Sequence, residues 1–244
     1  MNTKQVRHLL AWGCAAALAL VTAGAHAAHP LITEDTGTQG LGLRQLEIFG
    51  DESKDGAGRR QEVYTGVLSY GLAETADLQL GLPWYRNGGD GIGDVAFDLK
   101  WRFFERDALS FALKPGVTLP TGDEGDGRGT GKMTWGSLLI VSYAPGAIAL
   151  HAHLGFRRND NKLGERESLR QLAAAATYRV GDVRFVGELT RETNPVQGGR
   201  TVRYATVGAI WSMTRDVDFD IGWRQGYGGA PIDEALLLGA TVRW

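Results

Sequence analysis

The segment DVAFDLKWRF, residues 94–103, decides the fold class, because its side chains alternate between two kinds. On a β-strand, successive side chains point to opposite faces of the sheet. One face of this segment is apolar and consists of Val95, Phe97, Leu99, Trp101 and Phe103. The other face is small or charged and consists of Asp94, Ala96, Asp98, Lys100 and Arg102. The segment therefore predicts a strand that separates an apolar medium from a polar one.

The same two-residue period recurs from Leu43 onward, in segments of about ten residues. No long stretch shows the 3.6-residue period of a helix. The strands predicted in this way are 43–50, 61–71, 76–85, 94–104, 109–119, 134–143, 147–157, 169–180, 183–191, 201–212, 217–226 and 235–244. Short turns alternate with longer polar loops. The longer loops are predicted at 51–60, 86–93, 120–133, 158–168, 192–200 and 227–234. We predict an all-β fold, an antiparallel up-and-down transmembrane β-barrel of about twelve strands, over residues 43–244.

The composition agrees with a barrel and excludes several other classes of protein. Of the 244 residues, 35 are Gly, but they are too aperiodic for collagen, and a hydrophobic content of 43% is too high for a disordered chain. The mean hydropathy of −0.19 excludes a polytopic helical membrane protein, although it suits strands that alternate polar and apolar residues. The formal net charge of −2 provides no basic field, so nucleic acid is not an expected partner.

The first 27 residues form a secretory signal sequence by their pattern. Lys4 and Arg7 precede an almost unbroken apolar stretch at 9–23, and the A-x-A sequence at 25–27 is typical of a cleavage site. The only cysteine, Cys14, lies inside this segment, so the processed chain would contain no disulfide. Export combined with a barrel predicts the outer membrane of a Gram-negative bacterium as the location.

The apolar face of such a barrel points to lipid, whereas in a soluble lipocalin-like barrel it would point inward. We favour lipid, because the opposite face carries charges of mixed sign, as expected of a small aqueous lumen. The predicted lumen-lining residues are Asp98, Lys100, Arg102, Lys114, His151, His153, Arg184, Glu188, Arg203, Asp218, Asp220 and Arg224. The predicted aromatic girdle in contact with outer-membrane lipid is Tyr64, Tyr70, Trp84, Trp101, Phe103, Tyr143, Phe156, Tyr178, Trp223 and Trp244.

Two histidines are the first candidates for chemistry. His151 and His153 are two residues apart on a strand and therefore share a face, where two imidazoles could hold a metal. Neither a cysteine nor an adjacent carboxylate completes a site, so we predict no metal site and no cofactor. No motif places a serine beside these residues or His29, so we predict no catalytic residues and no enzyme.

An acidic, glycine-rich loop at 121–132 is the second candidate, because it contains Asp123, Glu124 and Asp126. Calcium takes several oxygen ligands, so binding to this loop stays open, although the spacing is not that of an EF-hand. A mobile surface loop is the favoured interpretation.

The end of the chain predicts a further interaction, made during assembly. The last strand places Leu236, Leu238, Ala240, Val242 and Trp244 on one face and ends on an aromatic residue. This pattern resembles the terminal signal that the outer-membrane barrel-assembly machinery reads, by a process similar to strand addition. We predict that machinery as a partner during insertion.

Three further stretches carry a resemblance to a known family: HPLITEDTGTQG at 29–40, GIGD at 91–94 and LPTGD at 119–123. With these stretches the chain resembles the family described as putative MetA-pathway of phenol degradation. Its members are outer-membrane barrels of Gram-negative bacteria. The resemblance implies passage of aromatic or other hydrophobic small molecules, and it implies no catalytic residues.

The segment 28–42 precedes the first strand, and its Pro30 and several Gly and Thr disfavour a lipid-facing strand. We predict that it lies at the periplasmic side or enters the lumen as a partial plug. Twelve strands enclose enough space for a narrow pore if side chains do not fill it. We therefore predict a channel for small hydrophobic or aromatic molecules. The alternatives are a non-conducting structural or surface barrel and, third, an outer-membrane enzyme.

Overall fold

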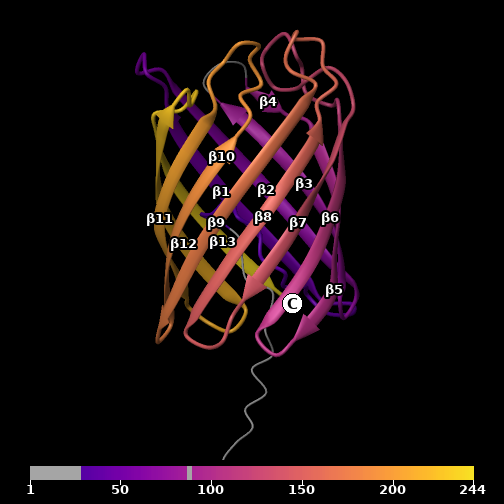
Figure 1. Cartoon of the computed structure of the whole chain (residues 1–244), viewed down its shortest axis with the longest axis vertical. Coiled ribbons are helices and arrows are strands. Elements are labelled where there is room, and N and C mark those ends of the chain that lie inside the picture. Colours follow the sequence, from indigo (N-terminus) through magenta and orange to yellow (C-terminus); the bar gives the residue numbers. More distant parts are fainter. Residues whose placement is uncertain (1–28, 87–89) are drawn as a thin grey trace, which may run out of the picture.

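The computed structural model describes residues 29–86 and 90–244, which form a closed antiparallel β-barrel (Figure 1), as predicted. The predicted signal sequence, 1–27, lies outside the described residues. The strands are β1 (Arg44–Lys54), β2 (Arg60–Ala73), β3 (Ala76–Arg86), β4 (Gly91–Ile92), β5 (Val95–Arg106), β6 (Leu109–Leu119), β7 (Thr134–Tyr143), β8 (Ile148–Arg158), β9 (Ser168–Val180), β10 (Val183–Glu192), β11 (Val202–Ser212), β12 (Val217–Gly228) and β13 (Glu234–Arg243). Twelve strands are long, and β4 is a two-residue pairing on β3. A helix long and apolar enough to cross a membrane is absent from the described residues.

The barrel closes because β1 pairs with β2 on one side and with β13 on the other. Leu46 lies opposite Leu68 of β2 and also opposite Val242 of β13. Arg44 and Trp244 exchange two backbone hydrogen bonds, of 2.9 and 3.0 Å, at the end of this seam. Closure joins the twelve long strands of the described residues into one continuous wall, in which ladder partners pair their backbone groups, as a lipid environment requires.

The connections between strands sort by length to the two ends of the barrel. The short turns include 74–75, 107–108 and 181–182 and lie at the bottom of Figure 1, which we call the short-turn rim. The longer connections include 120–133 and 193–201 and lie at the top, which we call the long-loop rim. This layout is typical of outer-membrane barrels, whose long loops are extracellular and whose short turns are periplasmic.

The predicted strands at 109–119 and 134–143 coincide with β6 and β7. The largest difference is at the end of β1, where residues 51–54, predicted as a loop, continue the ladder opposite residues 60–63 of β2. The prediction failed because this part of the wall rises above the apolar belt and its outward side chains are charged. Lys54 Nζ lies 2.8 Å from Glu234 Oε1, and Arg60 Nη1 lies 3.0 Å from Glu52 Oε1.

The outer face of the wall is an apolar belt. Leu154 of β8, Leu189 of β10 and Val207 of β11 are 58%, 69% and 63% exposed. So continuous an apolar surface is costly in water, and it is the surface that a membrane barrel presents to lipid. A soluble barrel would place these side chains inside.

All ten predicted girdle residues lie on the outer face and are between 38% and 52% exposed. Those nearer the short-turn rim are Tyr70, Trp101, Phe103, Tyr143, Tyr178 and Trp244, and those nearer the long-loop rim are Tyr64, Trp84 and Phe156. Trp223 differs, because it lies in the middle of β12, opposite Val207 and Leu236. A bulge between Arg102 and Phe104 leaves both Phe103 and Phe104 exposed, at 45% and 42%.

The last strand presents the predicted assembly signal to the outside. Leu236, Leu238, Ala240, Val242 and Trp244 alternate with the buried residues Ala235, Leu237 and Thr241. Leu238, Val242 and Trp244 are 50%, 42% and 52% exposed. The face is therefore accessible to another strand or to lipid, and its recognition by the assembly machinery stays a prediction.

Candidate functional site

Residues 29–40, which we call the inner segment, lie inside the barrel. At the short-turn rim, Thr38 Oγ1 donates a 2.8 Å hydrogen bond to the carbonyl oxygen of Glu74. Deeper in the lumen, Thr33 contacts Glu188 in the middle of β10. The segment forms no strand, because Pro30 lacks an N–H and the following residues are mostly polar. It is thus a separate element that the closed wall surrounds.

A buried ion-pair cluster holds the middle of the inner segment. Glu34 Oε2 lies 2.9 Å from Lys100 Nζ of β5, and Glu34 Oε1 lies 2.5 Å from Lys114 Nζ of β6. Burial alone would raise the pKa of Glu34, but the two lysines outweigh it and hold the pKa far below its usual value. Removing one partner of a buried pair typically costs about 3–5 kcal/mol, because the other charge stays buried and uncompensated. Glu34 is therefore the main electrostatic anchor of the segment.

His29 forms a second anchor, at the start of the inner segment. Its Nδ1 lies 2.5 Å from Asp220 Oδ1 of β12 and its Nε2 lies 3.3 Å from Asp51 Oδ1 of β1. The ring stacks on Phe49 with a centroid distance of 4.4 Å. Burial disfavours the charged imidazolium, but the hydrogen bonds to the two carboxylates outweigh burial and raise the pKa of His29. The imidazole ring thus bridges β12 and β1.

Backbone groups of the inner segment also bind the wall. The N–H and Oγ1 of Thr33 donate to Glu188 Oε2, at 2.5 and 2.6 Å. The N–H of Thr36 donates to Ser142 Oγ at 3.1 Å, and the N–H of Gln39 donates to both oxygens of Asp77 at 3.0 Å. Because buried backbone donors must find acceptors, these wall residues replace the ladder partners that a strand would have.

Two glycines provide the space for this arrangement. Gly208 of β11 and Gly222 of β12 lie opposite each other in the ladder. A Cβ on Gly222 would lie 2.7 Å from Pro30 Cβ, and one on Gly208 would lie 2.9 Å from Pro30 Cγ. Both distances are shorter than carbon atoms tolerate, so the wall must be bare here for the inner segment to lie against it.

Most of the predicted lumen-lining residues point into the barrel. On the inner face are Asp98, Lys100, Arg102, Lys114, His151, His153, Arg184, Glu188, Asp218, Asp220 and Arg224. The predictions that followed the alternation within one strand thus agree with the described geometry. What the sequence did not indicate is that the inner segment uses several of these side chains as its partners.

The prediction for Arg203 is wrong, because it is exposed on the outer face of β11 between the buried residues Val202 and Tyr204. The inner face of β11 is largely apolar, and its Ile210 is only 2% exposed. In this strand, the position of a charged residue therefore does not identify the face that lines the lumen.

The histidine pair is engaged in hydrogen bonds. His151 Nδ1 lies 2.8 Å from Ser142 Oγ, and His153 Nε2 lies 2.8 Å from Gln171 Oε1. His153 Nδ1 also accepts the N–H of Glu34 at 3.2 Å. Within residues 29–86 and 90–244, no group of three or more His, Cys, Asp or Glu side chains is arranged to hold a metal ion.

The acidic loop uses its carboxylates internally. Asp123 Oδ1 accepts the N–H groups of Gly125 and Asp126, at 2.8 and 3.1 Å. Glu124 Oε1 lies 2.5 Å from Lys162 Nζ, and this hydrogen bond lowers the pKa of Glu124. The loop is thereby tied to its neighbour at the long-loop rim.

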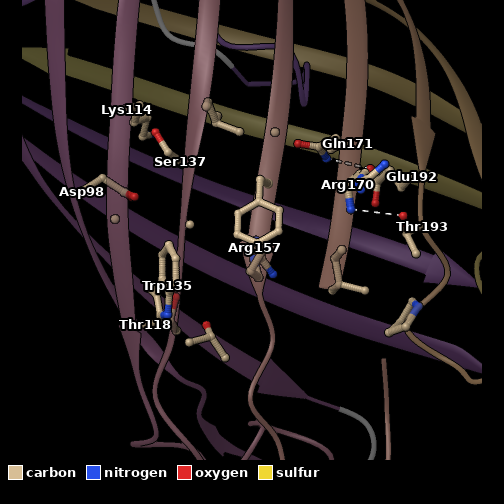
Figure 2. A pocket seen from close by; sticks show the side chains of 18 residues that line it. Asp98, Lys114, Thr118, Trp135, Ser137, Arg157, Arg170, Gln171, Glu192 and Thr193 are labelled. Atoms are coloured by element: carbon tan, nitrogen blue, oxygen red, sulfur yellow. Dashed lines mark hydrogen bonds between the residues drawn. The ribbon is translucent and has the colours of Figure 1, made fainter. Parts of the chain in front are cut away.

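Two adjoining cavities lie in the lumen beside the inner segment. The first, of about 360 Å³, lies toward the long-loop rim, and Figure 2 shows Lys114, Arg157 and Gln171 among its lining. The second, of about 410 Å³, has residues of the inner segment in its lining. Asp98 and Lys114 line both cavities, so the two spaces meet at these side chains.

The second cavity combines apolar and polar surfaces. Leu31, Ile32 and Phe49 supply apolar side chains, while Glu47 and Gln79 supply polar ones. Oε1 of Glu47 and Oε1 of Gln79 are buried and have no hydrogen-bond partner among the described residues. A buried acceptor without a partner is costly, so these two atoms are available to water or to a bound solute.

The comparisons with known proteins agree with this architecture. The family described as "Putative MetA-pathway of phenol degradation" matches residues 32–244. The chain belongs to this family. The match includes most of the inner segment as well as all the strands, so the inner segment is part of what the family describes. A search of curated proteins found no match.

Solved structures share the fold of this family member at low sequence identity. The NanC porin has a TM-score of 0.63 and 10% identity, with 81% of this chain and 98% of that chain covered. The COG4313 outer membrane channel from Pseudomonas putida F1 has a TM-score of 0.63 and 13% identity, with 86% and 98% covered. The KdgM porin has a TM-score of 0.58 and 10% identity, with 81% and 98% covered. These similarities establish a porin-like barrel fold.

Proposed function

We propose that this protein is an outer-membrane channel for small hydrophobic or aromatic molecules and that the inner segment closes it at rest. The observation that carries the proposal is the cavity of about 410 Å³ whose lining includes the inner segment. Cavities of about 300–1,000 Å³ with an apolar lining and a few polar groups suit small organic ligands. The family description, which names phenol degradation, supports aromatic molecules as the solute.

The way in which the inner segment is held supports a gate. The segment lies outside the ladder, because β1 begins only at Arg44. Ion pairs and hydrogen bonds hold it, so it can leave without disturbing the wall. If the signal sequence is cleaved after Ala27, as the sequence predicts, the segment lies next to a free chain end and can withdraw toward the short-turn rim.

The alternative is a non-conducting barrel in which the inner segment is a permanent core. The buried pairs of Glu34 with Lys100 and Lys114 favour this alternative, because such pairs are costly to separate. The two functions differ in one measurable property, which is whether a solute crosses the barrel.

The test is entry of neutral glycosides into liposomes that contain the refolded protein. Phenyl glucoside carries an aromatic ring but crosses lipid poorly, and methyl glucoside is its smaller counterpart. We expect phenyl glucoside to enter faster than methyl glucoside, against the order of size, because the cavity lining favours the ring. Folding is checked by heat-modifiable migration on a gel. Absence of entry by both solutes, with a folded barrel, would overturn the channel in favour of the structural barrel.

A further inference from the structure

Three arginines gather on the outer wall close to the long-loop rim. Arg170 of β9, Arg191 of β10 and Arg203 of β11 are all exposed. Arg191 lies directly opposite Arg203 in the ladder, and on its other side it lies opposite Leu172, two residues from Arg170. Like charges directly opposite each other on one face of a sheet are destabilising. The arrangement therefore requires a compensating interaction.

The described residues supply no counter-charge, since no carboxylate lies within 4.0 Å of these three guanidinium groups. The nearest acid in sequence, Glu192, accepts a 2.9 Å hydrogen bond from Gln171 Nε2 on the inner face (Figure 2). An anion from outside the described residues would remove this repulsion.

Arginines elsewhere on the same rim do have acidic partners. Arg60 lies 3.0 Å from Glu52, and Arg86 lies 3.9 Å from Glu62. The outer ends of β1–β3 are therefore self-neutralised, whereas those of β9–β11 are not. The arginines of β9–β11 therefore differ from Arg60 and Arg86 in having no acidic partner within 4.0 Å among the described residues.

A groove on the outer wall joins the basic patch to the apolar belt. It has a volume of about 590 Å³, and it is lined by Arg166, Arg170 and Arg191 together with Leu154, Phe156 and Leu172. Leu154 and Leu172 are 58% and 48% exposed, and Leu172 lies opposite both Leu154 and Arg191 in the ladder. We call these residues and Arg203 the arginine groove. Its shape and charge fit a molecule with an anionic head and an apolar chain.

We propose that the arginine groove binds the phosphate group of an outer-leaflet lipid, with the acyl chain of that lipid along Leu154 and Leu172. A phosphate between Arg191 and Arg203 accepts charge-assisted hydrogen bonds from both and cancels their repulsion. Arg170 lies on the neighbouring strand and completes the basic end of the groove. The site rests on the proposed location in the outer membrane, but it is independent of any passage through the lumen.

The experiment measures binding of bisphosphorylated lipid A to the refolded protein in phosphatidylcholine nanodiscs. The test variant is Arg191→Gln/Arg203→Gln, and the matched control is Arg60→Gln/Arg86→Gln, which removes two paired charges from the same rim. We expect the test variant to bind about tenfold or more weakly than wild type, because two charge-assisted contacts are lost. The control should bind within about twofold of wild type, because exposed pairs contribute little.

Two further arms identify the source of the phosphate. Dephosphorylated lipid A should bind wild type and test variant equally, because the anionic head is gone. Inorganic phosphate should not displace lipid A, because it lacks the chain that contacts Leu154 and Leu172.

Equal binding of lipid A by wild type and test variant would overturn the proposal, as would an equal loss in the control or displacement by inorganic phosphate. The single variant Arg191→Gln replaces the double variant if the latter does not fold. Entry of phenyl glucoside is measured separately in vesicles without lipid A, so failure of lipid binding and failure of the channel are distinct outcomes.

Discussion

The lumen and the arginine groove treat charge in opposite ways. In the lumen, Glu34 lies between Lys100 and Lys114, and its side chain is only 16% exposed. On the outer wall, Arg191 faces Arg203 and both are exposed. A buried charge must be paired, since desolvation is otherwise too costly. An exposed charge stays hydrated without a partner and is therefore accessible to a ligand. The contrast teaches that the charge of Glu34 inside the barrel is paired within the chain, whereas the exposed arginines of β9–β11 have no carboxylate within 4.0 Å among the described residues.

The change with the largest expected effect is Glu34→Ala, which leaves two buried lysines without their shared partner. We expect the inner segment to be destabilised in its place by about 3–5 kcal/mol. The measurement is single-channel conductance in planar bilayers, where open events should rise sharply over wild type. Glu52→Ala, which removes an exposed pair with Arg60, is the control and should leave conductance unchanged. Identical traces for Glu34→Ala and wild type would contradict the role of Glu34 as an anchor.

A smaller effect is expected from Gly222→Ala, whose new Cβ would approach Pro30 to 2.7 Å. Overpacking of this kind costs about 1–3 kcal/mol, and here the inner segment is the element that can move away. Protease sensitivity of the inner segment should increase while the barrel keeps its heat-modifiable migration. Gly66→Ala is the control, because a Cβ there meets nothing within 4 Å. Equal protection of the segment in both variants would show that it does not lie against β12.

Solute entry should depend on pH through His29. The pKa of His29 is raised above 6.5 because hydrogen bonds to Asp220 and Asp51 outweigh the effect of burial. A raised pKa means that the stabilisation is present below the unfolded value and is lost as pH rises through the folded value. Solute entry should therefore increase on going from about pH 6 to about pH 9.

The contribution of Glu34 to holding the inner segment depends on pH in the opposite direction. Because the pKa of Glu34 is lowered, this contribution is lost only on strong acidification.

The variant His29→Gln tests the alkaline effect, and it should lack the rise of solute entry at alkaline pH. A rise of the same size in that variant would assign the pH dependence to another group.

The smallest effect concerns the arginine groove without lipid. Replacing Arg191 by Gln removes a like-charge contact with Arg203, so the free energy of unfolding in detergent should rise by about 0.2–1 kcal/mol. Adding bisphosphorylated lipid A should reverse the order, because only wild type gains the full set of contacts. Urea midpoints with and without lipid A provide the measurement. A urea midpoint of Arg191→Gln below that of wild type in detergent alone would contradict a destabilising repulsion between Arg191 and Arg203.

Much of the wall was predictable from the sequence, because alternation reports which face a side chain occupies. The segment 94–103 and the strands at 109–119 and 134–143 illustrate this, since polar and apolar media lie on opposite sides of each. Arg203 shows the limit, because the inner face of β11 is largely apolar and includes Tyr204 and Ile210. Where both faces are apolar, a charge at one end of a strand does not indicate the side of the wall.

The contacts of the inner segment could not be predicted from the sequence, for a different reason. Glu34 meets Lys100 and Lys114, and His29 meets Asp220, only because the barrel closes and brings distant strands around one element. Alternation gives the face of a residue but not which strands lie across the lumen from it. The sequence alone could therefore not decide whether residues 28–42 lie at the periplasmic side or enter the lumen as a partial plug. That choice requires the pairing registers of the strands.

If the inner segment must move for solutes to pass, a reversible cross-link that holds it against the wall should block their passage. The hydroxyl oxygens of Thr36 and Ser110 lie 2.5 Å apart, so Thr36→Cys/Ser110→Cys places two thiols within reach of a disulfide. The only natural cysteine, Cys14, lies in the predicted signal sequence. We predict that the oxidised variant admits no phenyl glucoside and that reduction restores wild-type entry. Equal entry in the oxidised and reduced states would show that solutes pass without movement of the inner segment.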